Sequence, residues 1–284
     1  MRKLQPGVVP TMIVIVCLAS MAIAQTTKKQ FKYEVGPDAS VTVSNKYGPI
    51  AVHSANTKSV VVNVTLHSSK VEIDAQQTGS HVELLSHLLD GADHINAVVD
   101  YDLTVPYGTE LILRSSTGPL KVEKLGADVS LEGDSASVDV RDVTGAHVHV
   151  RTIDGEVTLS DIREGHVEVT TVGGKVYLHS VNGPMVKVET TTGQISYSGE
   201  LGTHGQYELH SYSGNIELML PLNASVDMTA ISQTGKVTTD FVFRNKPHTV
   251  GFFSHGQGIS GFLGSGSPPV SVKTVSGDVV INKH

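Results

Sequence analysis

The chain has 284 residues, one cysteine and no tryptophan, and 28 acidic side chains outnumber 21 basic ones to give a formal net charge of −7 at pH 7. This acidic balance argues against nucleic acid or anionic lipid as the main partner. The single cysteine, Cys17, excludes a disulfide framework and a thiolate metal centre. Aromatic residues make up only 5% of the chain, which weakens the case for a carbohydrate-binding surface without removing it.

The N-terminus has the three parts of a Sec signal peptide. Basic Arg2-Lys3 precedes an apolar run over residues 11–24, which ends in the small-x-small cleavage pattern Ala22-Ile23-Ala24. The run is shorter than the roughly 20 residues that a membrane span needs. We therefore predict a cleaved signal peptide over residues 1–24 and a mature chain without a transmembrane span. Such a protein is exported to the periplasm, the outer surface or the medium.

A strand–turn–strand pattern recurs through the mature chain. The segments "VRTIDGEVTL", "VTTVGGKVYL" and "VETTTGQISY" each place apolar residues seven and five positions before a glycine and two and four positions after it. We call the glycine position the slot. Nine copies fit this frame, and their slots fall at Gly48, Gly118, Ala136, Gly155, Gly174, Gly193, Gly214, Gly235 and Gly277. From Gly118 to Gly235 the slots are spaced by 18, 19, 19, 19, 21 and 21 residues.

Each copy reads as two short strands joined by a tight turn. Apolar residues two apart lie on one face of a strand, and a slot glycine permits the positive φ that some turns require. Three residues before the slot stands a small polar residue, which we call the ladder residue. Its inward side chain is expected to satisfy turn backbone groups. The ladder residues are Asn45, Ser115, Thr152, Thr171, Thr190, Ser211, Ser232 and Thr274, with Gly133 as the exception.

One copy cannot fold by itself. Four buried apolar side chains contribute roughly 6–12 kcal/mol, whereas ordering one copy costs roughly 20–40 kcal/mol. Copies must therefore pair with one another, as in a solenoid. A constant period stacks equivalent residues, so that His149, Glu168 and Lys187 would form one outward row. We predict an all-β, β-helix-like solenoid of roughly 19-residue repeats; an antiparallel hairpin meander or sandwich is the alternative.

Two segments do not follow the repeat pattern. Residues 25–110 are predicted to form an N-terminal cap and first sheet region, and residues 111–284 the solenoid, within one continuous domain over 25–284. Residues 241–269 form a predicted loop that is rich in glycine and holds five of the six phenylalanines. This loop either folds its aromatic rings over the open end of the core or exposes them as a partner patch. The candidates for that patch are Phe252, Phe253 and Phe262.

The chain resembles a known family at these motifs. The segments "VDYDLTVPYGTELILRSSTGPLKV", "VRTIDGEVTL" and "VSVKTVSGDVVINK" are similar to those of the exported β-strand-repeat, adhesin-type proteins of unknown function called DUF4097. The resemblance covers roughly residues 35–283. It implies a β-solenoid-like domain in a bacterial envelope and suggests adhesion. The family's motifs are structural, so no catalytic residue is carried over.

The sequence offers only weakly supported candidates for metal binding and for catalysis. His147 and His149 share a strand face and His166 would stack on His147, so that with Glu168 they could hold Zn²⁺ or Ni²⁺. Exposed strand histidines are the commoner explanation, and we predict no metal or cofactor. Some β-helices degrade polysaccharides with clustered acids. Here the acidic residues, such as Asp154 and Glu168, are expected at turns or on outward positions of strands.

These observations favour a non-enzymatic exported envelope protein, an adhesin or interaction scaffold that binds an unknown envelope protein or a glycan. No catalytic residue is predicted. The alternatives are a carbohydrate-active β-helix enzyme and a carbohydrate- or metal-binding module.

Overall fold

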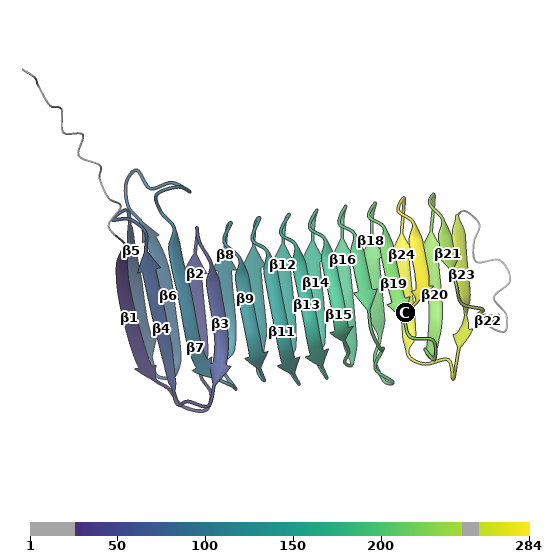
Figure 1. The fold of residues 1–284 in the computed structure, drawn as a ribbon, viewed down its shortest axis with the longest axis horizontal. Helices are drawn as coiled ribbons and strands as arrows, with labels where there is room; N and C mark the ends of the chain where they lie inside the picture. Colours follow the sequence, from purple (N-terminus) through teal and green to yellow (C-terminus); the bar gives the residue numbers. More distant parts are fainter. Residues whose placement is uncertain (1–25, 246–255) are drawn as a thin grey trace, which may run out of the picture.

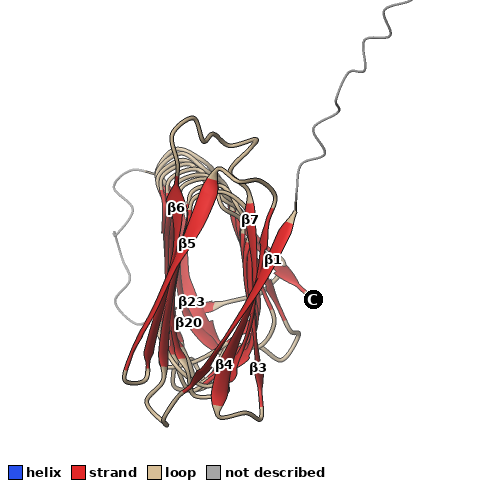
Figure 2. Cartoon of the chain, turned by 90° about the vertical axis from the view of Figure 1, so that its left-hand side faces the viewer, coloured by secondary structure: helices blue, strands red, loops and turns tan. Residues whose placement is uncertain are grey.

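The computed structural model describes residues 26–245 and 256–284, which form 25 strands in two facing sheets, A and B, with no helix among them. The strands lie side by side along one long axis, and the two sheets enclose a narrow interior (Figures 1 and 2).

Sheet A has twelve strands. In spatial order they are β1 (Thr27–Glu34), β4 (Ser59–Leu66), β7 (Val99–Pro106), β3 (Ile50–Ala55), β9 (Leu120–Leu125), β11 (Val138–Thr144), β13 (Val157–Arg163), β15 (Val176–Val181), β17 (Ile195–Ser198), β19 (Ile216–Leu220), β25 (Val279–Lys283) and β21 (Val237–Thr239).

Sheet B has thirteen strands. In spatial order they are β5 (Val71–Thr78), β6 (His81–Leu88), β2 (Ser40–Asn45), β8 (Glu110–Ser115), β10 (Val129–Gly133), β12 (His147–Thr152), β14 (His166–Thr171), β16 (Met185–Thr190), β18 (Tyr207–Ser211), β24 (Pro269–Thr274), β20 (Val226–Ser232), β23 (Gln257–Leu263) and β22 (Arg244–Asn245).

The repeats stack in parallel and in register, which confirms the predicted solenoid. Each copy gives one strand to each sheet and forms what we call a rung. Val148 on β12 pairs with Val167 on β14, and Val157 on β13 pairs with Val176 on β15. Among the described strands, antiparallel pairing is confined to the ends of the stack, at β1–β4, β4–β7, β5–β6, β20–β23 and β22–β23. The hairpin alternative is therefore wrong for the repeats.

The dry interior comes directly from the repeat frame. Val148, Val150, Val157 and Leu159 of one rung are each at most 1% exposed, and the corresponding residues of the neighbouring rungs are buried in the same way. Because each apolar residue lies over its equivalent, the core is a column of Val, Ile and Leu side chains between the sheets.

The ninth copy does not follow the eighth in space. Strand β24 lies between β18 and β20, and β25 lies between β19 and β21, so the ninth copy is inserted between the seventh and the eighth. The sequence could not predict this order, because every copy carries the same apolar pattern and can stack on any other. The eighth copy instead pairs on its other side with antiparallel β23.

The segment predicted as a loop over residues 241–269 contains strands β22 and β23, which extend sheet B beyond the repeats. Strand β23 forms because β20 offers an unpaired edge. Phe241 is only 9% exposed, Phe243 packs against the core, and their ring centroids are 6.3 Å apart. Phe262 is half-buried on β23. Phe252 and Phe253 lie outside the described residues, so the partner patch stays a prediction.

The N-terminal region continues both sheets. Strand β6 pairs in parallel with β2, and β7 pairs in parallel with β3, while β5, β4 and β1 add the antiparallel end strands. The outermost strand, β1, carries Lys28, Lys29 and Lys32, charges that discourage further strand pairing at an open edge. The predicted signal peptide lies outside the described residues, and the domain limits stay a prediction.

The slot glycines serve a different purpose from the one expected. Only Gly48 among them has a positive φ, of 105°. At the others, a Cβ would overlap the carbonyl oxygen of the slot residue on the neighbouring rung, as at Gly155 over Ala136 and Gly174 over Gly155. The same holds at Gly118, Gly193, Gly214, Gly235 and Gly277. The slots are therefore glycine because the turns of adjacent rungs are in direct backbone contact.

The ladder residues tie each turn to its neighbour. Thr152 Oγ1 accepts a hydrogen bond from Gly155 N at 3.1 Å and donates one to Asp134 O of the preceding rung at 3.2 Å. Thr171 and Thr190 make the same pair of bonds. These hydroxyls are buried, so each satisfies two backbone groups that water cannot reach.

One rung departs from the pattern: its ladder position is a glycine, Gly133, and its slot is an alanine, Ala136. A Cβ on Gly133 would lie 2.8 Å from Ala136 Cβ, just as a Cβ on Gly155 would lie 2.8 Å from Thr152 Oγ1. We expect Gly133→Thr alone to destabilise the protein by about 1–3 kcal/mol through overpacking. Adding Ala136→Gly restores the ladder and should recover that loss. A double-mutant cycle in urea measures this coupling, and additive effects would contradict it.

Candidate functional site

The outer face of sheet B carries two rows of polar side chains, which we call the sheet-B face. Residues in one row are register partners on adjacent strands, so the rows cross the strands of successive rungs. The first row comprises Ser130, His149, Glu168, Lys187, Glu208 and Ser271. The second comprises Arg114, Glu132, Arg151, Thr170, Glu189, His210 and Lys273.

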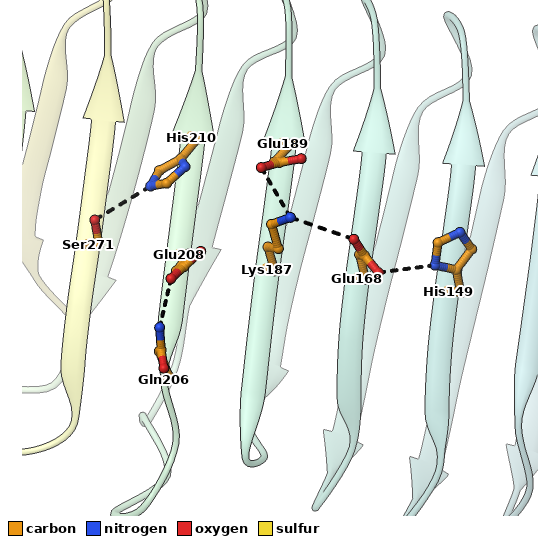
Figure 3. A network of polar contacts seen from close by, with 8 residues as sticks. All are labelled: His149, Glu168, Lys187, Glu189, Gln206, Glu208, His210 and Ser271. Atoms are coloured by element: carbon orange, nitrogen blue, oxygen red, sulfur yellow. Dashed lines mark hydrogen bonds and ion pairs between the residues drawn. The ribbon is translucent and has the colours of Figure 1, made fainter.

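A chain of charge contacts joins three rungs of this face (Figure 3). Glu168 lies between His149 Nδ1, 3.5 Å away, and Lys187 Nζ, 3.7 Å away. Lys187 Nζ is also 3.2 Å from Glu189 Oε1, and the hydrogen bond and charge of Glu189 raise the pKa of Lys187. All four side chains are between 31% and 47% exposed, so water screens these pairs and they add little to stability. Their charges remain accessible to a partner.

The neighbouring rungs continue the polar face. Gln206 Nε2 donates a hydrogen bond to Glu208 Oε1 at 2.7 Å, and His210 Nε2 lies 3.5 Å from Ser271 Oγ (Figure 3). Burial lowers the pKa of His210, and the positive charge of Lys273 acts in the same direction. Glu208 and Glu189 oppose this shift.

His210 should make stability depend on pH. Its folded pKa lies below the ordinary value of 6.5, so the unfolded chain binds the proton more readily. Above about pH 6.5 the ring is neutral in both the folded and the unfolded chain, and the full stability is present. The free energy of unfolding falls as the pH drops from there through the folded pKa of His210. We expect His210→Gln to flatten this loss, measured as urea midpoints between pH 7.5 and 5. The control is Thr170→Gln, a non-titrating change in the same row; an unaltered profile in His210→Gln would refute the assignment.

The predicted histidine cluster is partly assembled. His147 and His166 are register partners, and their ring centroids are 5.2 Å apart at 88°. His147 Nδ1 lies 3.3 Å from Asp128 Oδ2, whereas His149 faces Glu168. Among residues 26–245 and 256–284, no three His, Cys, Asp or Glu side chains are grouped as a metal ion would require. Of the two acids considered for catalysis, Glu168 lies on the sheet-B face and Asp154 in the turn between β12 and β13.

Sequence reasoning missed a groove at the N-terminal end of the same face. It has a volume of about 580 Å³ and runs over the ends of β2, β8, β10 and β12, with β6 as its far wall. Its walls and floor include Leu85, Arg114, Glu132, Arg151, Ile153 and the small residues Ser44 and Gly133. The break in the ladder at Gly133 was the only sequence signal, because β6 lies outside the repeat frame.

The chain is similar to solved structures of two bacterial proteins. A "putative adhesin" from Bacteroides fragilis is 11% identical, with 92% of this chain and 99% of that one covered and a TM-score of 0.46. A "putative adhesin" from Parabacteroides distasonis is also 11% identical, with 92% and 98% covered and a TM-score of 0.44. No curated protein matches the chain. Within the described residues there is no helix of the length and apolarity that crossing a bilayer demands.

The family model described as Toastrack DUF4097 matches residues 40–282. This span begins at β2 and ends in β25, so it includes all nine rungs. The chain therefore belongs to the Toastrack DUF4097 family.

Proposed function

We propose that this protein is a non-enzymatic, exported cell-envelope scaffold whose sheet-B face binds a partner, as an adhesin or an assembly module. The observation that carries the proposal is the pair of polar rows held in register across successive rungs. A parallel stack with a continuous apolar core fixes the spacing of these side chains at about 4.8 Å from strand to strand. A rigid periodic surface of this kind suits repeated contacts with an extended partner.

The residues that hold the turns together differ from the charged residues on the outer face, which supports a binding role for the charged residues. The repeated glycines and hydroxyl residues are engaged in the turns, as for Thr152 and Gly155. The charged residues are half-exposed and weakly paired, as for Glu168 and Lys187. Such pairs can exchange their partners for those of a ligand at little cost. The partner is an envelope protein or a glycan.

The test compares two charge-neutralised variants of the mature chain. The first carries Glu168→Gln, Lys187→Gln and Glu189→Gln on the sheet-B face; the control carries Glu123→Gln, Asp139→Asn and Arg141→Gln on sheet A. We expect the first to lose retention on intact cells and purified outer-membrane fragments, and the wild-type retention to weaken with salt. Equal retention of both variants would refute the proposal for this face.

Export is tested separately. We expect the full chain to be recovered from the envelope or medium with Gln25 as its first residue, by fractionation and N-terminal sequencing. Recovery of an uncleaved chain in the cytoplasm would exclude an envelope role.

A further inference from the structure

The groove at the N-terminal end of the sheet-B face exists because small residues interrupt a row of large ones. Leu85, Ser44, Arg114, Glu132 and Arg151 are register partners across β6, β2, β8, β10 and β12. The short side chain of Ser44 leaves a hollow between Leu85 and Arg114. Gly133, which replaces the usual ladder residue, lines the groove. Five strands at about 4.8 Å give the groove a length of roughly 20 Å, which matches about six residues of extended peptide.

The charges in the groove favour a carboxylate. Arg114 Nε donates to Glu132 Oε2 at 2.9 Å, so these two side chains neutralise each other. Arg151 has no ion pair or hydrogen bond to its guanidinium among the described residues, and Lys46 adds a second positive charge that only Asp134 opposes. The groove therefore has a net positive charge in a chain whose formal net charge is −7. A free guanidinium binds a carboxylate in a bidentate manner.

The walls of the groove favour aliphatic side chains. Leu85 is 44% exposed at the β6 end of the row, and Ile153 is 48% exposed at the other end, two residues after Arg151. The groove therefore offers one exposed aliphatic contact at each end, with Arg151 close to the Ile153 end. The described lining contains no aromatic ring on which a sugar could stack, so its chemistry fits a peptide better than a glycan.

We propose that this groove binds a short extended peptide of a partner protein, with an Asp or Glu side chain on Arg151, an aliphatic side chain beside it on Ile153, and a second aliphatic side chain on Leu85 at the far end of the groove. The acidic residue pairs with the guanidinium of Arg151. Because Leu85 lies four strands from Arg151, about 19 Å away, the residue that covers Leu85 stands about five or six positions along the peptide from the acidic one. The buried hydroxyls and amide beneath the groove, on Asn45, Ser86 and Tyr101, are bonded to one another and hold the floor rigid. The inference rests on the proposed function, because it names the chemistry of one partner.

The experiment selects peptides from a random heptapeptide phage library on the wild-type mature chain, with counter-selection on Arg151→Gln. We expect enriched peptides to carry an acidic residue next to Leu, Ile or Val, with a second such aliphatic residue about five or six positions along the peptide. A selected peptide should bind at least tenfold more weakly to Arg151→Gln and to Ser44→Leu, which fills the hollow. Arg163→Gln, an exposed arginine on β13 of sheet A, is the matched control and should bind as wild type does.

Each outcome decides the question. If Ser44→Leu does not fold, Arg151→Gln still tests the charge, and its melting temperature shows whether the fold is intact. Peptides that bind equally to wild type and Arg151→Gln, or no enrichment at all, would overturn the proposal. Binding of oligogalacturonate that depends on Arg151, without peptide enrichment, would make a glycan the occupant and also overturn it. The sheet-B triple variant should keep peptide binding, which separates this result from failure of the proposed function.

Discussion

Gly174→Val is expected to prevent cooperative folding, or to lower the free energy of unfolding by about 4 kcal/mol or more. The reason is local and specific to the stack. A Cβ on Gly174 would overlap the carbonyl oxygen of Gly155 on the neighbouring rung, and backbone cannot move away without breaking the register of both sheets. Urea unfolding followed by far-UV circular dichroism measures the change.

The matched control is Gly108→Ala, in the turn between β7 and β8. Gly108 has no heavy atom within 4 Å of a built Cβ and its φ is not positive, so this change should stay within about 1 kcal/mol and tend to stabilise. If Gly174→Val unfolded at the same urea concentration as Gly108→Ala, the backbone contact between rungs would be wrong.

Tyr197→Ala is expected to cost about 3–5 kcal/mol, because it empties a large space in the core. Tyr197 is completely buried, and its ring packs edge-on against Tyr207 with centroids 5.9 Å apart. Its hydroxyl lies 2.9 Å from Val181 O and 3.0 Å from Glu200 O, and burial strongly raises its pKa. Thermal and urea unfolding report the loss.

Two variants separate the parts of this effect. Tyr197→Phe keeps the ring and leaves a buried carbonyl without its donor, so it should cost about 1–3 kcal/mol. Tyr212→Ala removes a tyrosine that is 63% exposed in a turn and should change stability by less than about 0.5 kcal/mol. Equal losses for the exposed and buried tyrosines would contradict the assigned core.

The repeat frame favoured the parallel stack, because a spacing near 19 residues stays nearly constant through both turns of each copy, but it left an antiparallel hairpin arrangement open. It predicted the partnership of Val148 with Val167 and the row of His149, Glu168 and Lys187. It did not predict stacking order, since the copies are interchangeable in pattern. The ninth copy is inserted because the segment after β20 folds back as β23 and takes the outer edge of that strand.

Two features could not be predicted from the sequence: the backbone conformation six residues after the slots, and the groove. Lys124, Asp142, Asp161 and Ser180 each lie six residues after a slot and each has a positive φ between 53° and 59°. At the equivalent position of the next rung stands Gly199, with φ 125°. Glycine is the residue type that adopts a positive φ most readily, so of these five positions only Gly199 indicated the backbone conformation through its residue type. The groove was hidden for another reason: Leu85 comes from β6, and no residue pattern says which strand of the 25–110 region pairs with β2.

The stacking of rungs is tested most directly by disulfide formation between engineered cysteine pairs in a Cys17→Ser background. Glu208→Cys with Ser271→Cys joins register partners on β18 and β24, about 4.8 Å apart. Glu208→Cys with Thr229→Cys joins β18 to β20, two strands away at roughly twice that distance. A disulfide needs Cα atoms about 4.4–6.8 Å apart. We predict that mild oxidation links the first pair and leaves the second as thiols; linkage of the second pair alone would contradict the in-register stack and its order.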